Sequence, residues 1–104
     1  APGADVALGE DVAREAATVL RRGIEDRRGS SVGRLSATFS LDEGHRVTGL
    51  TGNADGQPPE PTAETFERLN RVFARLGEHP ATADVRAVRI RVGAGSDEIE
   101  LSRG

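Results

Sequence analysis

The sequence predicts an α+β domain in which two helices cover one face of a four-stranded antiparallel sheet. Two long stretches have apolar residues at three- and four-residue spacing, which is typical of amphipathic helices. Four shorter stretches alternate between apolar and polar residues, which is typical of strands with one buried face. The order is helix, hairpin, helix, hairpin. Helices and strands of this kind bury their apolar surfaces together as a two-layer sandwich.

The first helix is predicted over residues 10–27, and Gly29 follows it as a stop signal. Gly23 lies on the apolar stripe of this helix, where glycine costs about 1 kcal/mol relative to alanine. It is therefore expected to let a strand approach closely. Residues 1–9 show little periodicity and are expected to be flexible or to form an edge strand. Their first four residues, Ala1-Pro2-Gly3-Ala4, have the composition of a linker or a processed end.

The first hairpin is predicted around the turn Asp42-Glu43-Gly44. The glycine of this turn is expected to take the left-handed backbone conformation. The alternating pattern pairs Leu41 with His45 and Phe39 with Val47, and this register leaves the second face of the hairpin polar.

Irregular features follow the first hairpin. Leu50 falls out of phase, and Gly49 beside it indicates a β-bulge that returns Leu50 to the core. The segment Asn53–Pro61 contains three prolines and no periodicity, so we expect a loop of about nine residues. Thr62 is predicted to cap the second helix, which should end at Gly77.

The last hairpin is predicted over residues 84–104, and the apolar pairs on one face and the charged pairs on the other specify the same register. A slip of one residue would place Ile90 opposite Glu100 and turn apolar side chains toward water. Each exposed Arg–Glu pair contributes only a few tenths to about 1 kcal/mol, so the charges mainly mark the register. Gly93-Ala94-Gly95-Ser96 is expected to form the turn. The predicted pairs are Ile90–Ile99, Val88–Leu101, Arg91–Glu98 and Arg89–Glu100.

The element order is a circular permutation of the ferredoxin-like pattern. If residues 4–8 form a strand, the ordinary ferredoxin-like order appears with one strand added. The length of 104 residues matches one domain and permits a core without disulfides or metals, so residues 10–104 are expected to form a single domain.

The composition excludes several classes of protein. The net charge is −3 and the arginines alternate with acids, which argues against a dedicated nucleic-acid binder. The sequence has no cysteine, so it carries no disulfide framework and no thiolate zinc site. No apolar run approaches the roughly 18 residues of a membrane span, so the chain is expected to be soluble. All basic residues are arginine, and alanine and glycine are abundant, which suggests a genome of high GC content.

No catalytic, cofactor-binding or metal-binding site is predicted. His45 and His79 are the only histidines, and a metal-independent nuclease would use them as base and acid, with Arg46 or Arg89 holding the phosphate. One lies in a turn and the other at a helix end, so exposed loop histidines are the favoured interpretation. The segment Asn53-Ala54-Asp55-Gly56 resembles the start of a calcium loop but lacks the downstream glutamate, which favours a polar turn.

The sheet face opposite the helices is the candidate surface for a protein partner. It has no aromatic side chains on which nucleic-acid bases could stack. A polar sheet face, a free strand edge and a proline-rich loop are typical of recognition modules, although a merely solvated face is the alternative. The outer strands could also pair edge to edge in a homodimer. The candidate residues are Ser36, Thr38, Ser40, Arg46, Thr48, Arg89, Arg91, Glu98 and Glu100.

Short motifs spread along the chain are Asp42-Glu43-Gly44, Leu50-Thr51-Gly52, the helix at 62–76 and the strand at 85–92. Together they resemble the BON domain, a small module of bacterial envelope and periplasmic proteins. The chain departs from that pattern by one extra residue before Leu50, a longer proline loop and an added last strand. The resemblance implies a non-enzymatic domain that associates with envelope components, lipid headgroups or other proteins. It assigns no functional residue.

The leading hypothesis is a non-catalytic protein-interaction module, and an extracytoplasmic, envelope-associated location is favoured over a cytoplasmic one. Such a module would reach the membrane surface through a partner or a removed anchor. One alternative is a small nuclease or toxin that uses His45 and His79. Another is an immunity-type inhibitor that blocks the basic active site of a toxin with its carboxylates, namely Asp55, Glu60, Glu64, Asp97, Glu98 and Glu100.

Overall fold

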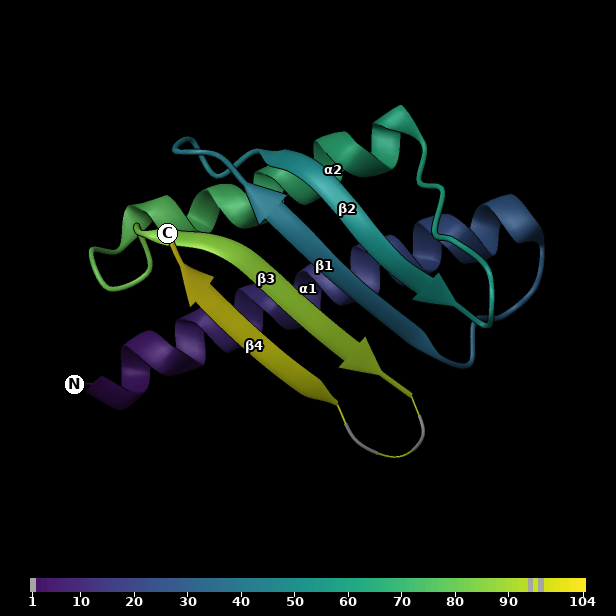
Figure 1. Ribbon diagram of the computed structural model, residues 1–104, viewed down its shortest axis with the longest axis horizontal. Helices are drawn as coiled ribbons and strands as arrows, with labels where there is room; N and C mark the ends of the chain where they lie inside the picture. Colours follow the sequence, from purple (N-terminus) through teal and green to yellow (C-terminus); the bar gives the residue numbers. More distant parts are fainter. Residues whose placement is uncertain (1, 94, 96) are drawn as a thin grey trace.

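Two helices cover one face of a four-stranded antiparallel sheet (Figure 1), which confirms the predicted α+β sandwich. The computed structural model describes residues 2–93, 95 and 97–104. The elements are α1 (Pro2–Arg28), β1 (Leu35–Leu41), β2 (Val47–Ala54), α2 (Ala63–Ala74), the 3-10 turn η1 (Arg75–Glu78), β3 (Val85–Val92) and β4 (Glu98–Arg103). No helix in this part of the chain has the length and apolar character needed to cross a bilayer.

Helix α1 begins well before its predicted start. Residues 2–9, which were expected to be flexible or to form an edge strand, are the first turns of this helix. Pro2 suits the first helical position because its missing N–H would have no partner inside the helix. At 1.5 Å per residue the 27 residues span about 40 Å, which matches the longest dimension of the molecule, 40 Å. The helix ends as predicted, with Gly29 in the left-handed conformation at φ 74°.

Gly23 permits a close approach, but its neighbour is a helix. A Cβ atom at this position would lie 2.5 Å from Oγ1 of Thr65 on α2. The expectation that a strand packs against Gly23 is therefore wrong. The two helices run antiparallel side by side, and Gly23 marks a point where α2 packs tightly against α1.

Helix α2 is capped as predicted, because Oγ1 of Thr62 accepts a hydrogen bond from the Thr65 N–H at 3.2 Å. The α-helix ends at Ala74, and the predicted end at Gly77 falls inside η1. Phe73 of α2 meets Phe39 of β1 edge to face, with ring centroids 4.9 Å apart. Such a pair contributes about 0.5–1.5 kcal/mol beyond the area it buries, so it joins the two layers at their centre.

The strand order is β2-β1-β3-β4. Strands β2 and β3 are parallel, lie on either side of β1 and are connected by α2, which is the split βαβ unit of ferredoxin-like folds. Strands β1 and β3, each the first strand of its hairpin, lie at the centre of the sheet. In a circularly permuted ferredoxin-like sheet the second strand of each hairpin would be central, so the fold is not that permutation. The central strands β1 and β3 contain most of the fully buried strand residues, which explains why they occupy the middle.

The register predicted for the β3–β4 hairpin is confirmed. Ile90 faces Ile99 and Val88 faces Leu101, while the paired arginines and glutamates lie on the other face. Ala94 and Ser96 of the expected turn lie outside the described residues.

The register predicted for the β1–β2 hairpin is wrong by two residues at Leu41 and by three at Phe39, which pairs with Leu50 and not with Val47. Leu41 pairs with Val47 and not with His45. The cause is Asp42, whose Oδ1 accepts hydrogen bonds from the N–H groups of Gly44 and Arg46, each at 2.9 Å. This lengthens the turn, and the residue in the left-handed conformation is His45, at φ 61°, instead of Gly44.

A β-bulge follows this turn, as predicted. The pairing shifts between Leu41–Val47 and Ser40–Gly49, so one extra residue lies in β2. The shift places Leu50 opposite Phe39 and against the core. Strand β2 then continues to Ala54. Asn53, the expected first residue of the proline-rich loop, therefore belongs to the strand, and the loop begins after Ala54.

Candidate protein-interaction surface

The sheet face that the helices leave uncovered is the candidate functional surface, here called the open face. Its side chains alternate along each strand with the buried ones that pack on the helices. The strand register arranges them in three rows across the sheet. From β2 to β4, the rows are Asn53–Ser36–Arg91–Glu98, Thr51–Thr38–Arg89–Glu100 and Gly49–Ser40–Ala87–Ser102.

The two halves of the open face differ in chemistry. The β2–β1 half has glycine and short polar side chains, whereas the β3–β4 half has arginines and glutamates. Nη1 of Arg91 lies 3.4 Å from Oε2 of Glu98, and both side chains are more than half exposed. An exposed pair of this kind contributes at most about 1 kcal/mol. Arg89 lies opposite Glu100 in the register, and no described carboxylate is within ion-pair distance of Arg89.

Most of the candidate residues predicted for this surface lie on it, but Arg46 and Thr48 do not occupy the positions expected for them. Arg46 belongs to the turn, and Thr48 is the extra residue of the bulge. Both were assigned through the wrong register. Thr51 takes the predicted place of Thr48 opposite Thr38, and Gly49 takes that of Arg46 opposite Ser40. The prediction also missed Asn53, which lies opposite Ser36. The alternation of Leu50, Gly52 and Ala54 was the signal that could have extended this strand.

One end of the open face is hollowed, and we call this site the arginine hollow. Its volume is about 490 Å³. Arg34, which directly precedes β1, and Arg91 of β3 contribute its positive charges. The lining residues are Arg34, Leu35, Ser36, Asn53, Arg91, Val92, Gly93 and Glu98.

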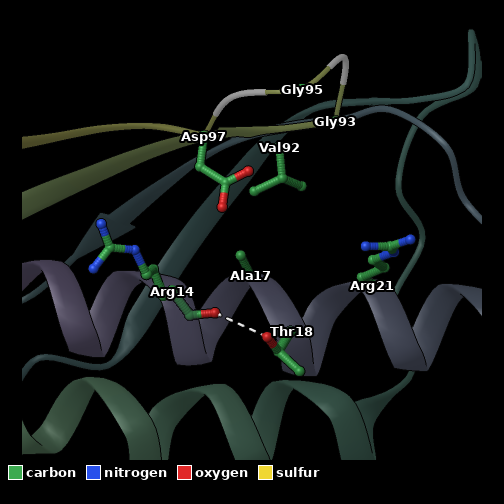
Figure 2. Close-up of a pocket in the computed structure, with 8 residues that line it drawn as sticks. All are labelled: Arg14, Ala17, Thr18, Arg21, Val92, Gly93, Gly95 and Asp97. Atoms are coloured by element: carbon green, nitrogen blue, oxygen red, sulfur yellow. Dashed lines mark hydrogen bonds between the residues drawn. The ribbon is translucent and has the colours of Figure 1, made fainter.

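A second hollow, of about 390 Å³, lies between α1 and the end of the β3–β4 hairpin (Figure 2). Arg14 and Arg21 of α1 flank it, and the side chain of Asp97 points toward α1. Arg14 lies 3.6 Å from Glu10 and Arg21 lies 3.5 Å from Glu25, so both arginines already have acidic neighbours on their own helix. This charge balance points to no particular class of ligand.

The structure places the two histidines in different environments. His45 is only 5% exposed, and its Nε2 donates a hydrogen bond to the carbonyl of Ala83 at 2.9 Å. Its ring packs beside Gly77, where an added Cβ would lie 3.1 Å from Nδ1. His79 is exposed at the end of η1. The expectation of an exposed loop histidine is therefore wrong for His45 and correct for His79.

Asp55 connects two loops. Its two carboxylate oxygens accept hydrogen bonds from the N–H groups of Gly33 and Arg34, each at 2.8 Å. The hydrogen bond from Gly33, followed by that from Arg34, lowers the pKa of Asp55 below its ordinary value. Oδ1 of Asn53 accepts from the Gly56 N–H at 2.7 Å, so the segment that resembles a calcium loop is a polar turn. Within the described residues, no group of three or more acidic or histidine side chains is placed to hold a metal ion.

Several carboxylates proposed for an inhibitory surface are engaged within the chain. Glu60 lies 3.6 Å from Arg27, and Glu64 lies 2.9 Å from Arg68. Asp55 is committed to backbone N–H groups. These pairs lower the net negative charge available to a basic partner.

Comparison of the chain with protein-family models, curated proteins and solved structures finds no match. The resemblance to the BON domain stays a prediction from short motifs. The geometry of the open face is therefore the basis for assigning a function.

Proposed function

We propose that this chain is a non-catalytic module that binds a partner protein through its open face. The observation that carries this proposal is the one-sided arrangement of the fold. Both helices pack on the same face of the sheet, so the opposite face presents three ordered rows of side chains to solvent.

The chemistry of the rows supports this role. On the β2–β1 side, glycine and short hydroxyl side chains allow a partner backbone to come close to the sheet. On the β3–β4 side, charged side chains fix the orientation of a partner through complementary charges. Arg89 offers a guanidinium that has no ion-pair partner among the described residues. Arginine is enriched at protein interfaces.

The BON-like motifs favour a partner in the bacterial envelope. An extracytoplasmic module of this kind would contact the membrane surface through that partner or through an anchor.

The alternatives have less support in the geometry. A two-histidine nuclease needs a base that substrate can reach, but the ring of His45 is buried and its Nε2 is bound to a carbonyl. An inhibitor of a basic toxin needs free carboxylates, and Asp55, Glu60 and Glu64 of the proposed set have partners within the chain.

The test is a pull-down from the native organism with the wild-type chain and the double variant Arg89→Glu, Arg91→Glu. The matched control is Arg22→Glu, Arg71→Glu, which makes the same change in charge on the exposed surfaces of α1 and α2. We expect one specific partner to be lost with the open-face variant and retained with the control. Recovery of the same proteins by both variants, with both folded by circular dichroism, would contradict the proposal.

A further inference from the structure

We propose that the arginine hollow binds a carboxylate group of the partner protein. This inference rests on the proposed function, because it assigns a chemistry to one end of the same open face. The hollow volume, about 490 Å³, falls within the range of about 300–1,000 Å³ that is typical of small-ligand sites. A side chain or a chain end fits a space of this size.

The hollow is rich in hydrogen-bond donors. The guanidinium of Arg34 has no ion-pair or hydrogen-bond partner among the described residues, and the hydroxyl of Ser36 likewise has none. Oδ1 of Asn53 is bound to the Gly56 N–H, so the donors of this amide are the groups that remain for a ligand. Donors of this kind favour an anion.

The acids near the hollow leave hydrogen-bond donors of both arginines free. Asp55 commits both oxygens to the backbone N–H groups of Gly33 and Arg34, so its charge attracts the Arg34 guanidinium without a direct hydrogen bond to it. Glu98 makes a single contact of 3.4 Å with Arg91, and both side chains are exposed. An exposed single contact is weak and leaves most donors of Arg91 available.

A carboxylate fits this site better than a phosphate. Glu98 already places a carboxylate beside Arg91 in the hollow, which shows that the geometry accepts one. The flat guanidinium fork binds a planar carboxylate through two parallel hydrogen bonds. The negative charge of Glu98 also repels a doubly charged phosphate more strongly than a singly charged carboxylate.

The experiment is an NMR titration of the folded chain with short soluble peptides. The probes are (Gly-Glu)3 amide, (Gly-Gln)3 amide, (Gly-Gln)3 with a free carboxyl end, and inorganic phosphate. We expect (Gly-Glu)3 amide to cause saturable shifts at the backbone amides of Ser36 and Asn53, whereas (Gly-Gln)3 amide causes none. Saturable binding of (Gly-Gln)3 with a free end would also support a carboxylate site and would identify a chain end as a source.

Two matched variants give the decisive comparison. Arg34→Gln should weaken the binding of (Gly-Glu)3 amide by about tenfold or more, because it removes a charged hydrogen-bond partner. Arg22→Gln, on the exposed surface of α1, should leave it unchanged. Equal effects of the two variants, equal binding of the uncharged peptide, or tighter binding of phosphate would overturn the proposal.

The pull-down separates this inference from the proposed function. Loss of the partner with Arg89→Glu, Arg91→Glu but normal recovery with Arg34→Gln would overturn the role of the hollow and leave the open face as the interface. Normal recovery with all variants would contradict the proposed function itself.

Discussion

At the residue scale, Asp55 has a structural role that its place in a polar loop did not reveal. It lies just after the end of β2 and binds the N–H groups of Gly33 and Arg34, which precede β1. Asp55 itself has a left-handed backbone, with φ 52°, which aspartate tolerates better than most residues. The carboxylate thus joins the segment before one strand to the end of its neighbour.

The hydrogen bonds to Asp55 make stability depend on pH. Its pKa is lower in the folded chain than its ordinary value of 3.8, because the N–H groups of Gly33 and then Arg34 favour the ionised form. Its stabilising effect is therefore complete above pH 3.8 and is lost as the pH falls through the lower folded-state pKa. We expect the wild type to be more stable than Asp55→Asn at pH 7 and this difference to shrink in acid. Urea unfolding of both proteins from pH 7 downward measures it, and a difference independent of pH would contradict it.

His45 and His79 form a natural pair of test and control. His45→Ala should lower the free energy of unfolding by about 1–3 kcal/mol, because it removes a buried ring and its hydrogen bond to Ala83. His79→Ala should change it by no more than about 0.5 kcal/mol, because this side chain is exposed. Chemical denaturation of the two variants makes the comparison. Equal effects would argue against the buried position of His45.

At the element scale, the contact between α1 and α2 is set by Gly23 and Thr65. Gly23→Ala would normally stabilise a helix by about 1 kcal/mol, but the added methyl meets Oγ1 of Thr65 at 2.5 Å. We expect overpacking to dominate, with a net loss of stability.

A double-mutant cycle with Thr65→Ala tests this explanation. In the double variant the remaining Thr65 atom close to the new methyl is Cβ, at 3.3 Å, so the clash is relieved. The second substitution should therefore restore part of the lost stability, with a coupling of about 0.5–3 kcal/mol measured by thermal or urea unfolding. Additive effects would show that the two residues do not limit the approach of the helices.

The two hairpins show how far the sequence could predict the sheet. In the β3–β4 hairpin, apolar pairs and charged pairs specify the same register, so the prediction is correct in every pair named. In the β1–β2 hairpin, the turn depends on a side chain, because Asp42 binds two backbone N–H groups and His45 takes the left-handed conformation. Alternation of apolar residues carries no information about that turn.

The residues of the candidate site were predicted correctly where the strand register was correct, and wrongly where it was not. The residues of β1, β3 and β4 follow from alternation and lie on the open face, whereas those taken from β2 inherit the error in the turn. The arginine hollow was not predicted, because Arg34 lies outside the strands. The pairing of β1 with β3 is what brings Arg34 and Arg91 to the same hollow. Proximity of this kind needs the tertiary structure.

At the scale of the whole molecule, the two edges of the sheet differ. The outer edge of β2 is occupied at both ends. The Val47 N–H donates to Oδ1 of Asn70 at 2.8 Å, and Ala54 exchanges hydrogen bonds with Gln57. Strand β4 is the other edge strand, and no strand covers its outer side in the described structure. Backbone groups on such an edge are a template for pairing with another chain.

Glu100 is the feature that we expect to keep β4 from pairing with a second copy of itself. Antiparallel pairing centred on this residue would match Ile99 of one copy with Leu101 of the other, which is favourable. The same register places Glu100 opposite Glu100, and like charges directly opposite one another destabilise a sheet. Glu100→Thr removes the repulsion and adds a residue that favours strands.

Sedimentation equilibrium therefore should show a larger dimer fraction for Glu100→Thr than for the wild type at the same concentration. Glu43→Thr is the matched control, because it makes the same replacement at an exposed position in the turn between β1 and β2. If the wild type already forms the dimer, or if both variants associate equally, the charge on β4 is not what protects this edge.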